Sequence, residues 1–412
     1  MDSYEQQLAE LNQQLFTANT AEQSNIVSGK RSVESLIEQL KGERLIDFLA
    51  GSNWLPSYAF PQDVVRLLVR QQSKSKHMRL ERDRERGISE YAPGSEVIAD
   101  GLLFKSAGVI KRGKEFRVRK YQYCRNCRQL QLDDENTKRA FDCECGDVSQ
   151  GREQRLFIEP AGFQTFYKEL VTEPNLYRLR PPSNSELFLI PSLADEKFDP
   201  HPEIPGVTCG HNKEGKLFRA NPGKDGKQFP TCRNCGRHLP EMERGKKKRE
   251  GHETPWGTKC NAGLFATDLA HIFKTDTLQI RFDQEALNPP TVADEVFWLS
   301  FQTAFVAAAA EVLSIPRSDL GGTYRSQSFN SLQGELVIFD RVPGGAGYVE
   351  RIIEELPAIL KRTGERVEKC ENPLCDPSGS CYACLRNYEN QFRWDKLQRR
   401  CVAEWLEVAA IK

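Results

Sequence analysis

The chain lacks the features that mark exported, membrane-spanning or uniformly charged proteins. Its 58 basic and 58 acidic side chains give a formal net charge of zero. This balance excludes a uniformly basic coat for nucleic acid and leaves only local basic patches. The N-terminus has no basic segment followed by an apolar run, so it does not resemble a secretory signal. The best candidate for a membrane span, residues 294–313, carries polar side chains and begins with two acids. We therefore expect a buried helix there and a cytoplasmic protein without a membrane partner.

Motifs that bind nucleotides or perform hydrolysis are also missing. No G-x-x-x-x-G-K-[ST] phosphate-binding loop occurs, and the glycine-rich run at residues 343–347 lacks the lysine and the hydroxyl group of that motif. Neither H-E-x-x-H nor G-x-S-x-G is present, and six histidines leave few general bases. We thus expect no catalytic residue, no cofactor-binding residue apart from metal ligands, and a chain that is not an enzyme. A nuclease with an unrecognised active site is the alternative.

Cysteine, by contrast, is abundant, and twelve of the thirteen cysteines fall into three groups of four. In a reducing compartment, clustered thiols bind metal more often than they form disulfides. In the first group, two pairs of neighbouring cysteines lie at the two ends of one loop. This arrangement suits a tetrahedral structural zinc. The third group lies within fifteen residues that hold almost no apolar side chain, so folding there needs a metal, either zinc or the competing iron–sulfur cluster. The first group is Cys124, Cys127, Cys143 and Cys145, and the third is Cys370, Cys375, Cys381 and Cys384.

The middle group is less regular, because only two of its cysteines form a close pair. We predict Cys209, Cys232, Cys235 and Cys260 as its ligands. Histidine serves zinc as well as cysteine does, and His211, His238 and His252 all compete, with His252 the first substitute. Three groups predict about three zinc ions. The remaining Cys401 sits in a helical pattern, where we expect a buried apolar side chain.

Hydrophobic periodicity predicts a mixed fold, either α+β or α/β, made of several modules. We expect three zinc knuckles or ribbons and a C-terminal α/β layer, with a core helix near residues 297–312 and a buried strand at 336–339. The expected domains are a helical N-terminal arm (1–53), a basic β-rich region with the first zinc module (54–194), the second zinc module (195–265) and the α/β domain with the third zinc module (266–412).

One segment is strongly basic. Residues 105–128 contain nine basic side chains and one acid, interleaved with Phe116, Tyr121 and Tyr123. We expect a strand over residues 115–123 that follows the DNA backbone and stacks unpaired bases, with a solvated charged face as the alternative. The predicted DNA-binding residues are Lys111, Arg112, Lys114, Arg117, Arg119 and Lys120.

A family resemblance rests on the C-terminal motifs. Residues 340–348, DRVPGGAGY, followed by the third cysteine group and by LRNY at 385–388, resemble the MrfA-type zinc-binding domain of certain superfamily-two DNA helicases. Looser similarity at residues 55–61, 88–94 and 267–268 extends the resemblance from about residue 54 to the C-terminus. A chain of this family without motor motifs resembles DrmB, the helicase-associated subunit of the DISARM anti-phage system.

This resemblance implies a DrmA-like superfamily-two helicase as partner and DNA, single-stranded or with an overhang, as ligand. It implies zinc on the four cysteines of the third group and carries over no catalytic residue. The resulting expectation is a non-catalytic accessory subunit that binds DNA and docks onto a helicase in anti-phage defence. The separately encoded C-terminal half of a split helicase is the alternative.

Overall fold

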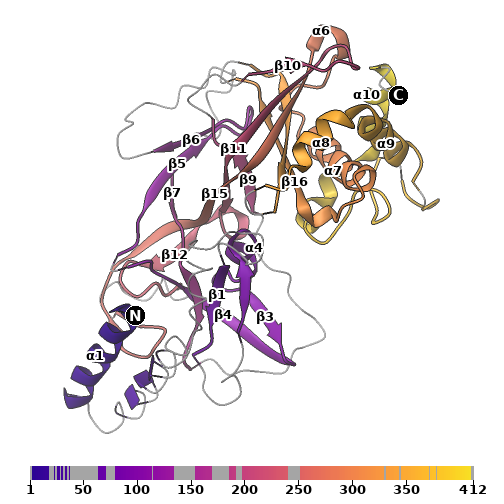
Figure 1. Ribbon diagram of the computed structural model, residues 1–412. Helices are drawn as coiled ribbons and strands as arrows, with labels where there is room; N and C mark the ends of the chain where they lie inside the picture. The colour runs from indigo at the N-terminus through magenta and orange to yellow at the C-terminus, as the bar shows by residue number, and fades with distance from the viewer. Residues whose placement is uncertain are drawn as a thin grey trace. The chain divides into compact units, whose positions relative to one another are not determined.

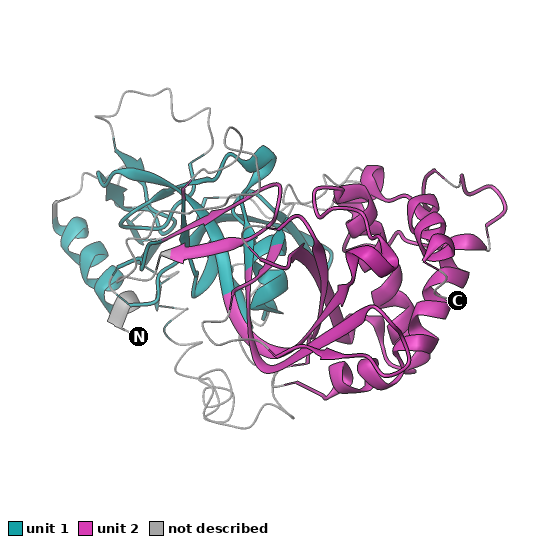
Figure 2. Cartoon of the chain, turned by 90° about the horizontal axis from the view of Figure 1, so that it is seen from above, with its two compact units in different colours: residues 1–119, 155–186, 219–271 teal, residues 120–154, 187–218, 272–412 magenta. Residues whose placement is uncertain are grey.

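The computed structural model describes residues 2–17, isolated positions between 23 and 37, and the ranges 64–70, 79–113, 115–133, 154–168, 185–191, 197–239, 251–328, 331–342, 345–370, 372–376 and 378–409. These residues form two compact units, each assembled from three separate stretches of the chain (Figure 2). Unit 1 comprises residues 1–119, 155–186 and 219–271, and unit 2 comprises residues 120–154, 187–218 and 272–412. Among the described residues, no helix has both the length and the apolar character that crossing a bilayer requires.

Two long strands explain why the units do not follow four consecutive domains along the sequence. Strand β11 (Val207–Asn221) and strand β15 (Leu264–Phe282) each begin in one unit and end in the other. The chain therefore passes several times between the two units, and each of the units collects segments that are far apart in sequence.

Unit 1 contains a five-stranded sheet with the order β2-β1-β8-β4-β3. Strands β1, β3 and β4 of this sheet are labelled in Figure 1. Strand β1 pairs parallel with β8, and the other neighbouring pairs are antiparallel. Alternate side chains of β1 point inward, so Val65 and Leu67 pack with Ile88 of helix α4. The element bounds are β1 Val64–Leu68, β2 Glu81–Asp83, α4 Arg84–Glu90, β3 Glu96–Ala99, β4 Leu102–Ile110 and β8 Gly162–Thr165.

A second group of strands in unit 1 is built on the first part of β15. Strand β7 (Arg155–Ile158) pairs with it in parallel, and strand β12 (Phe229–Cys232) pairs antiparallel. Arg155 and Asp268 join β7 to β15 through two hydrogen bonds of 2.7 and 2.9 Å, and both side chains are buried. Helix α1 (Asp2–Thr17) places Leu11 in a small core with Trp256, beside the cysteines of the middle group.

Unit 2 is organised around an antiparallel sheet in which β17 lies between β15 and β16. All seven residues of β17 (Gly334–Asp340) are buried, in agreement with the strand predicted at 336–339. Strand β16 spans Leu320–Ser326, and the helices are α6 (Gln284–Leu287), α7 (Glu295–Val312), α8 (Tyr348–Glu354), α9 (Leu356–Glu368) and α10 (Arg399–Val408). The remaining strands are β5 Arg119–Tyr123, β6 Leu130–Asp133, β9 Glu186–Leu189 and β10 Asp199–Pro200.

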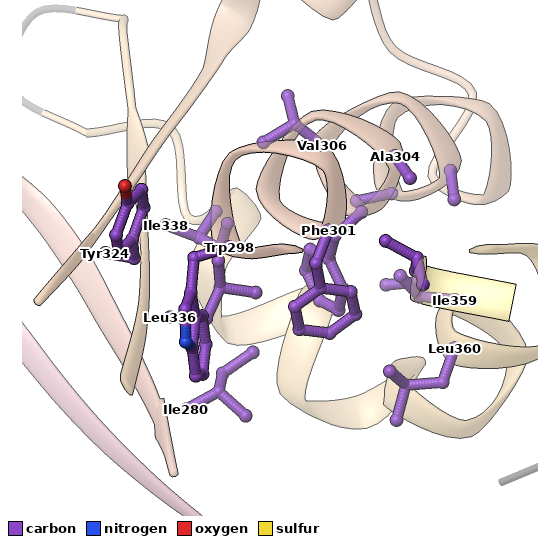
Figure 3. Packing of buried hydrophobic residues seen from close by; sticks show 14 of the residues in the cluster. Ile280, Trp298, Phe301, Ala304, Val306, Tyr324, Leu336, Ile338, Ile359 and Leu360 are labelled. Atoms are coloured by element: carbon purple, nitrogen blue, oxygen red, sulfur yellow. The ribbon is translucent and has the colours of Figure 1, made fainter. Parts of the chain in front are cut away.

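Helix α7 is the core helix that the sequence predicts, and it is buried on nearly every side (Figure 3). Its N-terminus is capped by Asp294, whose carboxylate accepts a hydrogen bond of 2.9 Å from the Phe297 amide. Trp298 packs directly on the sheet, at a place where a Cβ atom on Gly334 would lie 2.2 Å from its indole ring. Glycine is therefore required at position 334 for the helix to approach β17. The predicted mixed α+β class is confirmed.

Candidate metal centres

Unit 1 brings together three cysteines and one histidine. The ligand atoms of Cys232, Cys235, His252 and Cys260 all lie within 4.8 Å of one another. Sγ of Cys232 is 3.7 Å from Sγ of Cys260, and Sγ of Cys235 is 3.2 Å from Nε2 of His252. Four such donors around one point form the ligand set of a structural zinc site.

Two short structural elements place these four ligands. The first is a tight turn at the end of β12, in which the amides of Asn234 and Cys235 both point at Sγ of Cys232, at 3.4 and 3.5 Å. Gly236 closes this turn at φ 71°, where a Cβ atom would lie 2.1 Å from the Val109 carbonyl. The second is the hairpin of β13 (His252–Glu253) and β14 (Lys259–Cys260), whose register sets His252 opposite Cys260. A knuckle and a hairpin thus face each other with two ligands each.

The four ligand side chains of this group shift one another's pKa values through hydrogen bonds. Hydrogen bonding to Cys232 and Cys260 raises the pKa of His252 to about 9. Hydrogen bonding to Cys232 lowers the pKa of Cys260, which favours the thiolate form of this side chain. Metal ions bind thiolate rather than thiol, so this charge distribution favours a cation between the four groups.

The prediction that Cys209 belongs to this group is corrected by the structure. Cys209 lies on the part of β11 that belongs to unit 2, where it is buried and pairs in register with Asp199. Burial raises the pKa of its thiol to about 12, as expected for an apolar core side chain. His252, predicted as the substitute, supplies the fourth ligand atom. His211 instead faces Glu350 in unit 2, and His238 packs edge-on against Phe229.

The second group lies in unit 2 and consists of Cys370, Cys375, Cys381 and Cys384, as the sequence predicts. Its Sγ–Sγ distances are 3.4 Å for Cys370–Cys381, 3.9 Å for Cys375–Cys384 and 3.8 Å for Cys381–Cys384. A tetrahedral zinc with bonds of about 2.3 Å sets its sulfur ligands about 3.8 Å apart. The cysteines therefore have the spacing of a closed structural zinc site.

Arginine side chains connect this module to the neighbouring helices. Arg366 of α9 donates hydrogen bonds to the carbonyl groups of Ala383 and Cys384, both at 3.1 Å. Arg399 of α10 donates to the carbonyl groups of Val367, Glu368 and Cys375. These hydrogen bonds attach the segment of residues 370–384, which has few apolar side chains, to helices α9 and α10. We call this segment and the residues that follow it up to Trp394 the zinc module of unit 2.

Two of the four cysteines in the first predicted group lie among the described residues. Cys124 and Cys127 are buried in a turn in which the Cys127 amide points at Sγ of Cys124, at 3.4 Å. Cys143 and Cys145 lie outside the described residues. The unassigned Cys401 is half-buried on α10, and burial raises the pKa of its thiol to about 11.

The predicted DNA-binding segment differs from expectation in two ways. Its strand, β5, begins only at Arg119 rather than at residue 115. The interleaved rings face inward, since Tyr121 is 2% exposed and packs against Phe218, and Phe116 packs against Phe265. Among the cations, Arg112, Arg117 and Lys120 are exposed, Lys111 is half-buried, Arg119 pairs with Glu159, and Lys114 lies outside the described residues.

Comparisons with known proteins agree with the third cysteine group. Residues 301–385 match the model of the MrfA Zn-binding domain. The Druantia protein DruE of Escherichia coli (strain UMEA 4076-1) is 25% identical over 89% of this chain. Among solved structures, the DUF1998 helicase MrfA bound to DNA is similar over 84% of the chain with a TM-score of 0.39 and 9% identity. The same helicase without DNA gives a TM-score of 0.34 and 11% identity.

These comparisons overturn one prediction and restrict others. The prediction that the chain is not an enzyme is contradicted by its similarity to DruE and by its match to the MrfA Zn-binding domain. The chain spans 22% of the length of DruE and 34% of that of the DNA-bound MrfA. The predicted resemblance to the MrfA-type zinc-binding domain is confirmed by the match at residues 301–385.

Proposed function

We propose that the chain forms the zinc-binding part of a DNA helicase that acts in anti-phage defence. The observation that carries this proposal is the MrfA Zn-binding domain, which ends at the four-cysteine group of unit 2. MrfA itself is a helicase whose structure is known with bound DNA. The similarity to the Druantia protein DruE favours the defence role.

In this proposal, a motor segment or chain supplies the ATP-binding site, because this sequence has no phosphate-binding loop. The partner that fits the sequence resemblance is a DrmA-like superfamily-two helicase, and the DNA substrate is single-stranded or has an overhang.

Two zinc ions fit the two ligand groups described above, and a third fits Cys124 and Cys127 together with Cys143 and Cys145. Zinc acts structurally at the two described sites, because protein side chains supply four ligands at each of them.

DNA binding by exposed cations can be tested with charge reversals. Arg112 and Arg117 are exposed, so replacing both with Glu is expected to weaken DNA binding without unfolding unit 1. Losing two phosphate contacts reduces the log–log salt slope by roughly 1 to 2. The matched control is the double reversal of Lys224 and Lys361, which are also exposed but lie outside the basic segment.

The measurement is fluorescence anisotropy with labelled single-stranded, duplex and overhang DNA over a range of salt concentrations. The expected result is binding by the parent chain and the control, with weaker binding by the Arg112/Arg117 variant. A parent chain that binds none of the three DNAs at low salt contradicts the proposed function. Equal losses in the variant and the control contradict the placement of the contact.

A further inference from the structure

An exposed aromatic group lies on the zinc module of unit 2. Tyr382 sits between the ligands Cys381 and Cys384, and 68% of its surface is exposed. Its ring meets that of Trp394 edge-on, with ring centroids 5.1 Å apart and an interplanar angle of 80°. The guanidinium group of Arg386 lies over the same indole, 5.2 Å from its centroid. We call Tyr382, Arg386 and Trp394 the Tyr382 shelf.

The shelf is held in place by the backbone around it. The amides of Cys384, Leu385 and Arg386 all donate hydrogen bonds to the carbonyl group of Cys381, which fixes the turn that carries Tyr382. Nε1 of Trp394 donates to Oδ1 of Asn390 at 2.9 Å, which fixes the indole. A ring that is both fixed and exposed loses little conformational entropy when a ligand binds, so it is well suited to recognition.

Further apolar side chains are exposed on the same module. They are Leu374 at 91%, Tyr388 at 63% and Phe392 at 38%. A large apolar side chain that is exposed to water does not contribute the free energy that its burial would give. Groups of such side chains on a surface are typical of binding sites. The composition of this surface is mostly aromatic, which favours a ligand with flat rings over an aliphatic one.

Charge near the shelf favours an anionic ligand. The guanidinium group of Arg317 interacts electrostatically with Arg341 and Arg366 and with the carboxylates of Glu311 and Glu389. Arg366 also donates to the carbonyl group of Ala383, the residue next to Tyr382. The guanidinium group of Arg317 makes no hydrogen bond or ion pair with any other described residue, and burial lowers its pKa. The guanidinium groups of Arg366 and Arg386 therefore lie at the turn and the indole that form the shelf.

We propose that the Tyr382 shelf stacks an unpaired nucleobase of single-stranded DNA, while the neighbouring arginine side chains attract the phosphate backbone. Every base has a flat face, so aromatic side chains bind single strands with little sequence preference. In duplex DNA those faces are covered by neighbouring bases, so the shelf distinguishes single strands from duplexes. This inference rests on the proposed function and adds the residues that hold the separated strand.

The test uses the full 412-residue chain and two probes, a fluorescein-labelled thymidine oligonucleotide and a blunt duplex of equal length. Tyr382→Ala is expected to weaken binding of the single strand at least about 5-fold, the lower end of the effect of losing one base–aromatic stack. Tyr382→Phe is expected to bind like the parent chain, and duplex binding is expected to change less than twofold in either variant. Zinc content of each variant verifies that the module is folded.

Leu374→Ala is the matched control, because Leu374 is more exposed than Tyr382 on the same module but has no ring. It is expected to leave single-strand binding unchanged. An equal loss in Leu374→Ala and Tyr382→Ala indicates a general apolar contact, as in protein docking, and overturns the stacking proposal. If the parent chain binds the single strand and Tyr382→Ala binds it equally well, the shelf is overturned while the proposed function stands. If the parent chain binds neither probe, both are overturned.

Discussion

Nε2 of His252 lies 3.2 Å from Sγ of Cys235, which belongs to the knuckle at the end of β12. This contact makes the unit 1 site a Cys₃His site rather than the Cys₄ site expected from the sequence. The imidazole ring comes from the β13–β14 hairpin, which also supplies Cys260. The β13–β14 hairpin therefore determines which side chain is the fourth ligand. Substitution of His252 tests this assignment.

Replacing His252 with Ala is expected to remove one zinc ion per chain, because three thiolates remain and the hairpin loses its link to the knuckle. His252→Cys is expected to retain the metal as a Cys₄ site. Cys209→Ala is the control and is expected to keep the full zinc content, since Cys209 lies in the unit 2 core. Loss of zinc in Cys209→Ala together with full retention in His252→Ala would show that the ligand set is misassigned.

The buried ion pair of unit 1 gives a prediction about stability. Asp268 is fully buried and Arg155 is 8% exposed, so Asp268→Ala leaves a buried guanidinium without its partner. The expected loss in the free energy of unfolding is about 3–5 kcal/mol. The exposed pair Lys168–Glu253 is the control, and Lys168→Ala is expected to cost less than about 1 kcal/mol. Urea unfolding measures both, and equal effects in the two variants would contradict the assignment.

Two glycine substitutions in unit 2 are expected to act in opposite directions. Gly334→Ala places a methyl group in the space of the Trp298 ring and is expected to destabilise the fold by about 1–3 kcal/mol. Gly364→Ala lies inside α9 with its nearest neighbour, Leu406, at 3.8 Å, so the methyl group fits. Alanine is a better helix former, and a gain of about 0.5–1 kcal/mol is expected. Thermal unfolding distinguishes the two, and a stabilising Gly334→Ala would refute the packing described for α7.

The thiol of Cys401 gives a prediction about pH. Burial raises its pKa to about 11, so the protonated form dominates at neutral pH and the reactive thiolate forms only as the pH approaches 11. Alkylation of Cys401 in the native chain is thus expected to accelerate about tenfold per pH unit from 7 to 10. Iodoacetamide labelling followed by peptide mass spectrometry measures the rate, with the urea-unfolded chain as reference. A rate that levels off near pH 9 would mean that the thiol is not shielded.

Local features of this fold are predictable from the sequence. The apolar residues of α7 predict a buried helix, and the run at 336–339 predicts a buried strand, because burial on all sides leaves a continuous apolar pattern. The third cysteine group is predictable because its four ligands lie within fifteen residues. Because these four cysteines are so close in sequence, the chain has few ways to arrange their side chains.

Features that depend on distant segments are not predictable in this way. Cys209 and Cys260 are both about one loop from the Cys232–Cys235 pair, and only the paths of β11 and β14 separate them. The aromatic residues of the basic segment alternate with charges in the sequence, yet Tyr121 is buried by Phe218 from another stretch of unit 2. Several exposed rings lie instead on the zinc module, among them Tyr382, which stands between two cysteines in the sequence.

Elemental analysis of the undenatured chain tests the central claim most directly. We expect close to three zinc ions per chain, of which one is lost in Cys384→Ser and another in Cys235→Ser, because each variant breaks one of the two described ligand groups. Metal-binding free energy is folding free energy in such modules, so each variant is also expected to lose structure around its own site. One zinc ion or fewer in the parent chain, or substantial iron with a visible chromophore, would contradict the account.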